Sequence, residues 1–144
     1  MPRYSAGVVT GAGSTTLPII SLYAAAAVGA RIREIGATNT TATEVVLKLI
    51  RMTTTGTRGS ALTNAKHDPA SAAAGCSAYG THTVTATNTD MGYRTVLGAA
   101  IGSGVIWTFG DSGLVIPVGT GNGIGIMVGS GTGQACSCYI VWDE

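Results

Sequence analysis

Three cysteines and two histidines are the residues of this chain that could bind a metal or act as thiol nucleophiles. Zinc sites use C-x-x-C or H-x-x-x-H spacings, and neither is present. Cys136 and Cys138 fall on one side of a predicted strand, about 6.5–7 Å apart, which suits a disulfide poorly. The odd count also argues against a secreted disulfide framework. We expect Cys76, Cys136 and Cys138 to be small buried apolar residues, and no metal or other cofactor.

Ser112 is the best candidate for a catalytic nucleophile. Its segment, Gly110-Asp111-Ser112-Gly113-Leu114, resembles the Gly-Asp-Ser-Gly-Gly segment of chymotrypsin-like proteases, although Leu114 replaces the last glycine. That family needs a histidine base and an aspartate that orients it. The candidates for these roles are His67, His82, Asp68 and Asp90. Because Asp, Ser and Gly are also typical turn residues, the segment predicts a tight turn, and a small serine hydrolase is a distant alternative.

The charged residues form no convincing catalytic or phosphate-binding motif. The acids are scattered without an evident glycosidase pair. The glycines at 119, 121, 123 and 125 match no G-x-G-x-x-G pattern, and no Gly-Lys pair of the Walker type exists. Arg31, Arg33 and Glu34 in one segment, with Glu44, Lys48 and Arg51 in the next, predict cross-strand ion pairs. A phosphate patch of Arg31, Arg33 and Arg51 is the alternative.

The elements that would position these residues are strands. Short runs rich in β-branched residues alternate apolar and polar positions and are separated by Gly, Asn and Thr. The predicted strands are 4–10, 18–23, 30–38, 44–53, 76–86, 92–99, 105–109, 114–118, 124–128 and 135–142. Helix signals are thin, and 53–64 is typical of a long exposed loop. The alternation places Trp107 and Trp142 on apolar faces, which favours the core for both.

Short strands with frequent turns predict an all-β antiparallel β-sandwich, and an eight-stranded jelly roll fits the length best. The 144 residues are enough for one domain, 1–144. No apolar run is long enough for a membrane-spanning helix, and the N-terminus lacks the apolar stretch of a secretory signal. A net charge of +1 gives no support to binding of nucleic acid or an anionic membrane.

Charged residues make up only 10% of the chain, whereas soluble domains average about 25%. Gly, Ala, Thr and Ser together account for about half of it. The surface must therefore be built largely from small neutral residues. Such a surface can be buried against a partner without desolvating charges, and we interpret it as a sign of assembly.

Three segments of the sequence carry a resemblance to a known class of proteins. They are Arg3-Tyr4-Ser5-Ala6-Gly7-Val8-Val9-Thr10-Gly11-Ala12-Gly13-Ser14-Thr15-Thr16-Leu17-Pro18, Ile106-Trp107-Thr108-Phe109-Gly110 and Tyr139-Ile140-Val141-Trp142-Asp143-Glu144. With these segments the chain resembles small virion proteins of tailed bacteriophages. The nearest functional class is the jelly-roll head-decoration, or cement, protein. This resemblance implies a homotrimer on the capsid exterior, assembled in the host cytoplasm, that binds and stabilises the major capsid protein lattice. The alternatives are a trimeric tail-fibre or receptor-binding β-domain and a main capsid shell protein.

We expect the interface to involve Arg3, Tyr4, Arg31 and Arg33. Met1–Thr10 could form an N-terminal arm that adds a strand to a neighbour, with Arg3 and Tyr4 as anchors. On that hypothesis, deletion of the arm abolishes capsid binding and leaves a folded β-protein.

Overall fold

A computed structural model describes all 144 residues and contains strands but no α-helix. The eleven strands are β1 (Arg3–Val9), β2 (Ile20–Tyr23), β3 (Ala30–Asn39), β4 (Val45–Met52), β5 (Ala65–Lys66), β6 (Ser77–Tyr79), β7 (Asn88–Leu97), β8 (Gly104–Thr108), β9 (Leu114–Ile116), β10 (Gly123–Ser130) and β11 (Cys136–Asp143). Three of them, β5, β6 and β9, have only two or three residues.

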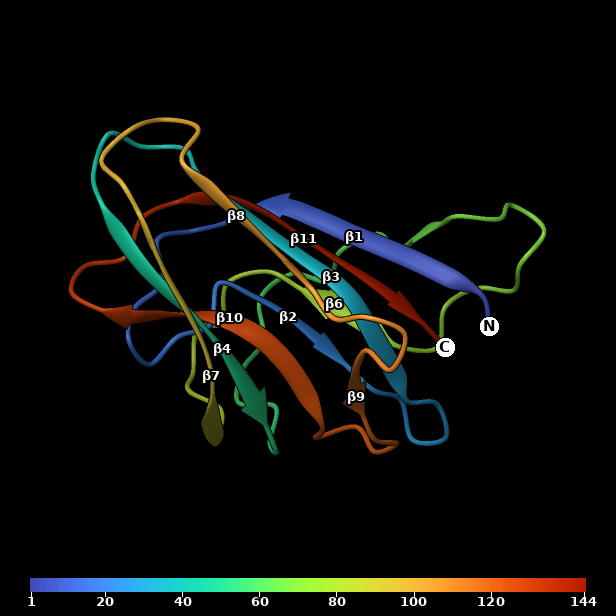
Figure 1. The fold of residues 1–144 in the computed structure, drawn as a ribbon. Coiled ribbons are helices and arrows are strands. Elements are labelled where there is room, and N and C mark those ends of the chain that lie inside the picture. The colour runs from blue at the N-terminus through green and yellow to red at the C-terminus, as the bar shows by residue number, and fades with distance from the viewer.

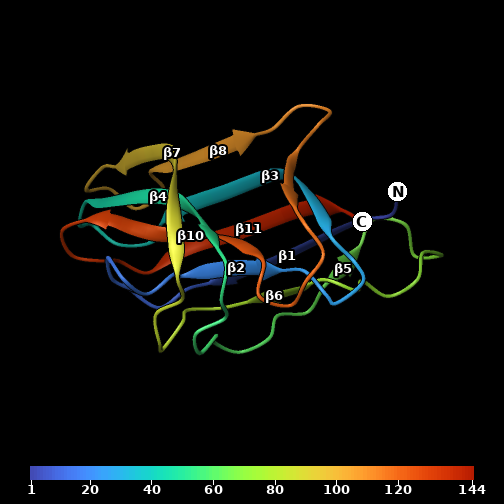
Figure 2. The same ribbon diagram turned by 90° about the horizontal axis from the view of Figure 1, so that it is seen from below.

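The strands form two sheets that pack face to face (Figures 1 and 2). Sheet A has the order β5-β1-β11-β3-β8, with β9 also paired to β3, and sheet B has the order β6-β2-β10-β4-β7. All strand pairs are antiparallel. The expected all-β antiparallel sandwich is confirmed, with eleven strands in place of eight. The jelly-roll connectivity stays a prediction.

The core lies between the sheets and follows the alternation of the sequence. Inward side chains are fully buried on both sheets, among them Ile140 and Trp142 of β11 and Leu47 and Leu49 of β4. A period of two turns every second side chain of a strand toward the facing sheet. The expectation for Trp142 is confirmed, whereas Trp107 on β8 is only partly buried at the margin of the core.

Residues 1–10 are not an arm, which corrects the expectation for this segment. β1 pairs with β11 along its whole length and with β5 on its other side. Tyr4 is 2% exposed, packs against Trp142 and donates its hydroxyl to the carbonyl of Ala72. An extended arm would add solvent-accessible surface, but the chain has 6204 Å², below the roughly 6,800 Å² expected for a compact monomer of this mass. Met1–Thr10 therefore belongs to the fold, and its deletion would remove a sheet strand and core side chains.

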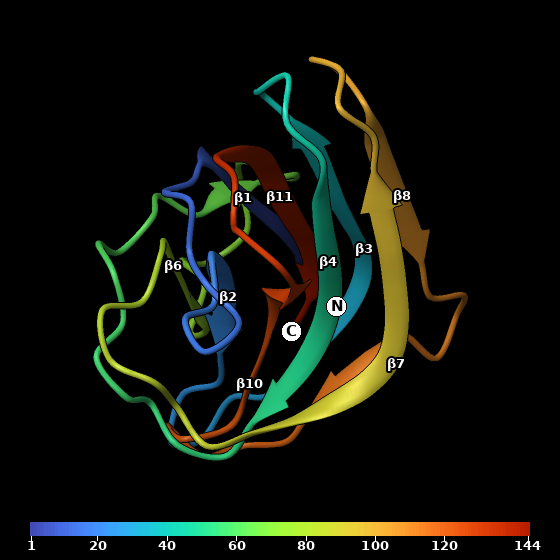
Figure 3. The same ribbon diagram turned by 90° about the vertical axis from the view of Figure 1, so that its left-hand side faces the viewer.

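The segment between β4 and β7 departs most from the predicted elements. The strand expected over residues 76–86 is reduced to β6, and residues 53–64 are not simply an exposed loop. We call residues 53–61 and 80–87 the cover, because they lie along the side of sheet B that faces away from sheet A (Figure 3). Thr57 bridges to Val84, which joins the two stretches, and Ala61 bridges to Tyr79 at the edge of sheet B. A second apolar cluster lies between the cover and the sheet, with Ala86 from the cover and Tyr23, Ile50, Met52 and Met127 from the strands.

The two ends of the sandwich differ in charge. The connections β1–β2, β3–β4, β7–β8 and β10–β11 gather at one end, and both termini lie at the other (Figure 1). In those four connections Glu44 is the only charged residue. The arginines at positions 3, 31 and 33 lie toward the end that holds the termini: the register places Arg3 and Arg31 opposite Asp143, the second-to-last residue of the chain, and Arg33 pairs with its carboxylate.

Candidate functional site

The outer face of sheet A is a broad surface. Unlike the outer face of sheet B, it has no chain segment lying across it. We call it the open face: the outward side chains of β1, β11, β3 and β8. The strand register aligns Gly7, Tyr139, Gly36 and Ile106 in one row and Val9, Ser137, Thr38 and Gly104 in the next. Both rows consist of small or apolar residues apart from the tyrosine. At its ends the face is exposed, with Val9 and Ile106 each 63% accessible.

The Tyr139 ring lies over Gly36 at the centre of the open face. A Cβ atom on Gly36 would lie 2.5 Å from Cζ of the Tyr139 ring, so the ring occupies the space above the glycine. The Tyr139 hydroxyl donates a hydrogen bond to the Glu34 carboxylate. Burial, together with this hydrogen bond, raises the pKa of Tyr139 to about 12. Beside the ring is a shallow hollow of about 290 Å³ with Thr38, Gly104 and Ile106 in its wall.

Asp143 joins two of the expected interface arginines at the margin of the open face. Its carboxylate accepts Nε of Arg3 at 2.7 Å and Nε of Arg33 at 2.6 Å. The Asp143 side chain is 5% exposed, while that of Arg3 is 47% exposed. The hydrogen bond from Arg3, and then that from Arg33, lowers the pKa of the Asp143 carboxyl, so this group is ionised at neutral pH.

The turn at Gly110–Gly113 is held by the neighbouring arginines. Arg33 donates to the carbonyls of Gly110 and Asp111, and Arg31 donates to that of Ser112 at 3.1 Å. Both glycines of the turn have positive φ, as a tight turn requires. The structure therefore brings Arg3, Arg31 and Arg33 to one margin of sheet A. Tyr4 of the expected set lies in the core instead.

The predicted ion pairs between 31–34 and 44–51 are wrong. β3 and β4 follow each other in sequence but belong to opposite sheets, so their side chains are not cross-strand neighbours. Lys48 and Arg94 pair with Asp90 on β7, and Arg51 donates to the carbonyl of Val115. The phosphate patch of Arg31, Arg33 and Arg51 is not formed as a free cluster, because protein carbonyls and Asp143 occupy these guanidinium groups.

The protease-like constellation is not assembled around Ser112. Neither histidine hydrogen-bonds to it. His82 instead lies 2.9 Å from the hydroxyl of Ser21, measured at Nε2, and these two residues are 1% and 0% exposed. Its Nδ1 atom has no partner, so no carboxylate orients the ring as a catalytic aspartate would. No sequence signal linked Ser21 to His82, which is 61 positions away.

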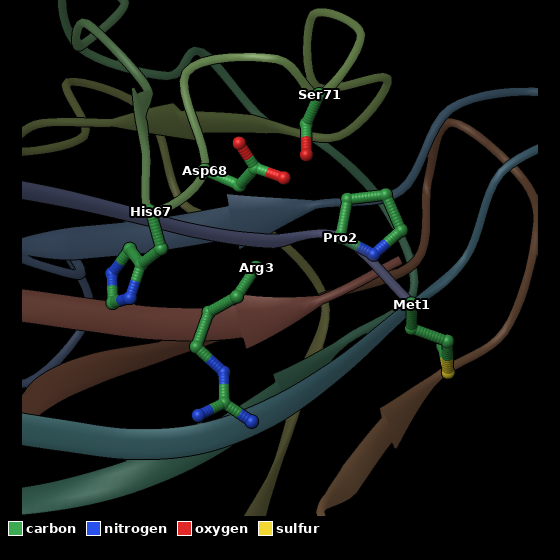
Figure 4. A pocket seen from close by; sticks show the side chains of 6 residues that line it. All are labelled: Met1, Pro2, Arg3, His67, Asp68 and Ser71. Carbon is green, nitrogen blue, oxygen red and sulfur yellow. The ribbon is translucent and has the colours of Figure 1, made fainter.

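A polar hollow of about 600 Å³ beside the N-terminus brings together Met1, Pro2, Arg3, His67, Asp68 and Ser71 (Figure 4). The His67 ring points away from Asp68 and Ser71 in this view. The Asp68 carboxylate accepts the backbone N–H of Ala70, and no hydrogen bond joins the His67, Asp68 and Ser71 side chains. These three residues therefore do not form a nucleophile–base–acid relay.

The three cysteines are buried and unpaired, as expected. Burial raises the pKa of the Cys76 thiol to about 12 and that of Cys136 to about 11. A thiol nucleophile needs a lowered pKa and access to solvent, so these are structural residues. No group of three or more His, Cys, Asp or Glu side chains is placed to hold a metal ion. The structure also has no helix long and apolar enough to cross a membrane.

The candidate site is thus a weakly charged sheet face with an arginine–aspartate cluster at its margin. No protein-family model, curated protein or solved structure matches the chain.

Proposed function

We propose that the chain is a structural protein of a tailed-phage virion, a decoration protein that forms a homotrimer and stabilises the lattice of the major capsid protein. The observation that carries this proposal is the open face of sheet A. Apart from Tyr139 and its hydrogen-bond partner Glu34, the central rows of this face consist of Gly, Ser, Thr and a few apolar side chains, in a chain that is only 10% charged.

The connectivity supports the jelly-roll part of this proposal. Without the three short strands, the sheets have the orders β1-β11-β3-β8 and β2-β10-β4-β7. The chain alternates between the sheets from β1 to β4, and again from β7 to β11 once β9 is set aside. This is the order that two Greek keys produce when they fold over each other in a jelly roll.

The surface chemistry supports binding to a repetitive partner. Small neutral side chains allow close backbone approach, and little charge must be desolvated when the open face is covered. Each contact can be weak, because simultaneous engagement of several subunits raises the effective affinity. The half-exposed Arg3 beside Asp143 would add an oriented charge at the margin, which favours one docking register over others.

The test compares two exposed β-branched residues on opposite sides of the sandwich. Ile106 on the open face is 63% exposed, and Val84 on the cover is 54% exposed. Light scattering of the wild-type protein should first give a mass near three times 14.4 kDa. Purified Ile106→Lys and Val84→Lys proteins are then added to expanded capsids of the phage that encodes the chain, and bound protein is measured after sedimentation.

We expect wild type and Val84→Lys to sediment with capsids and Ile106→Lys to be lost from them by at least tenfold. Equal binding of both variants would show that the open face is not the contact surface. A wild-type protein that ignores capsids but adsorbs to host cells would replace the decoration role with a receptor-binding one.

A further inference from the structure

A buried histidine holds the cover against sheet B. His82 lies in the cover, and its Nε2 atom is 2.9 Å from Oγ of Ser21 on β2. Its backbone N–H donates to the carbonyl of Pro18, just before β2, at 2.8 Å. One residue thus attaches the cover to β2 through its side chain and to the segment just before β2 through its backbone.

The imidazole site is built for a neutral ring. The Tyr23 ring stacks on the imidazole with centroids 6.0 Å apart. The Arg58 guanidinium lies over the Tyr23 and Tyr79 rings, 5.0 and 4.1 Å from their centroids. Tyr23 from β2, Tyr79 from β6 and Arg58 from the cover are the titratable groups around His82, while β4 and β10 supply the apolar side chains of the second cluster. No carboxylate hydrogen-bonds to the ring.

Protonation would be incompatible with this site. An imidazolium carries N–H groups on both nitrogens, and the Nδ1 atom is buried without an acceptor. The new charge would also sit near the positive Arg58 in an apolar environment. Burial, and to a smaller degree Arg58, accordingly lowers the pKa of His82 from 6.5 to about 4.

We propose that the cover is an acid-releasable clasp: protonation of His82 detaches the cover from sheet B while the sandwich stays folded. Release would uncover the second cluster, including Tyr23, Met52 and Met127. The main core lies on the other face of sheet B, and none of its residues belongs to the cover. The chain would therefore gain an exposed apolar face on acidification, separate from the open face of sheet A.

The direction in which pH changes the release of the cover follows from proton linkage. The released cover binds a proton at the ordinary histidine pKa of 6.5, whereas the closed form binds it only near 4. Release is therefore favoured as the pH falls through this window, by about tenfold in the opening equilibrium for each pH unit. Above pH 6.5 the equilibrium no longer depends on His82.

Hydrogen exchange read by mass spectrometry, corrected for the intrinsic rate at each pH, tests the clasp. We expect protection of the cover amides to fall about tenfold per unit between pH 6.5 and 4, while β3 and β11 stay protected. His82→Gln, which cannot be protonated, should make cover protection independent of pH. His67→Gln, the same change at the exposed histidine, should behave as wild type. Arg58→Gln should reduce the total loss of cover protection on acidification, because removal of the neighbouring cation raises the pKa of His82 in the closed form and narrows the pH window.

Two results would overturn the proposal. In the first, the cover and β11 lose protection together, which is global acid unfolding. In the second, His82→Gln keeps the wild-type pH dependence, which assigns the effect to carboxylates. If His82→Gln fails to fold, NMR titration of the wild-type His82 ring decides, and a pKa near 6.5 in the folded protein would contradict the clasp.

Discussion

Asp143 is the residue whose replacement tests the arginine cluster most directly. In Asp143→Asn the side chain keeps its size but loses the charge that accepts Nε of Arg3 and Nε of Arg33. A hydrogen bond to a charged group contributes about 1.5–3 kcal/mol when it is buried, and an exposed ion pair contributes about 0–1 kcal/mol. Arg33 is 22% exposed and Arg3 is 47% exposed, so the first value applies to Arg33 and the second to Arg3. We expect a loss of about 2–3 kcal/mol in the free energy of unfolding.

Urea denaturation at pH 7, followed by circular dichroism, measures this loss. Asp111→Asn is the matched control: the same substitution in a turn where the Asp111 backbone carbonyl, and not its carboxylate, accepts the Arg33 hydrogen bond. It should change the stability by less than about 0.5 kcal/mol.

The pH dependence gives a second check. The pKa of Asp143 is lowered in the folded protein, so its stabilisation is complete above the unfolded value, about 3.9, and is lost as the pH falls through the folded value. The difference between wild type and Asp143→Asn should therefore be constant from pH 7 to 5 and shrink in stronger acid. Equal stability of the two proteins at pH 7 would refute the reasoning that this cluster supports the fold.

Three further predictions concern the fold. Removal of residues 1–9 takes away β1 and the buried Tyr4, so the product should be unfolded by far-UV circular dichroism, and a native spectrum would contradict the conclusion that β1 is an integral strand of sheet A. Gly36→Ala forces the Tyr139 ring off the open face, and we expect a loss of about 1–3 kcal/mol in urea denaturation with a changed near-UV spectrum. Gly98→Ala should not alter that spectrum, because a Cβ on Gly98 meets only Oγ of Ser103, at an ordinary contact distance of 3.7 Å. The three thiols should react with a thiol reagent such as 5,5′-dithiobis(2-nitrobenzoate) only after denaturation, and rapid labelling of the native protein would show that one of them is accessible.

The sequence alone determined the strands and the direction in which their side chains point. Cys136, Cys138, Ile140 and Trp142 form an inward stripe on β11 because a period of two is a local property of extended backbone. The turn around Ser112 was predictable for the same reason, since Gly110 and Gly113 supply the positive φ values that it needs. Local chemistry was therefore enough for the all-β class, the core face of each long strand and the buried cysteines.

Only the tertiary structure decided which strands became neighbours. Arg3 and Asp143 are 140 positions apart, and β1 is a sheet strand because it pairs with the last strand of the chain. β3 and β4 are adjacent in sequence yet lie in opposite sheets, so the ion pairs expected between them do not form. The contact between Ser21 and His82 arises only when the cover folds over sheet B. Strand pairing in a sandwich joins distant segments, and hydrophobic periodicity specifies a face but not the partner that covers it.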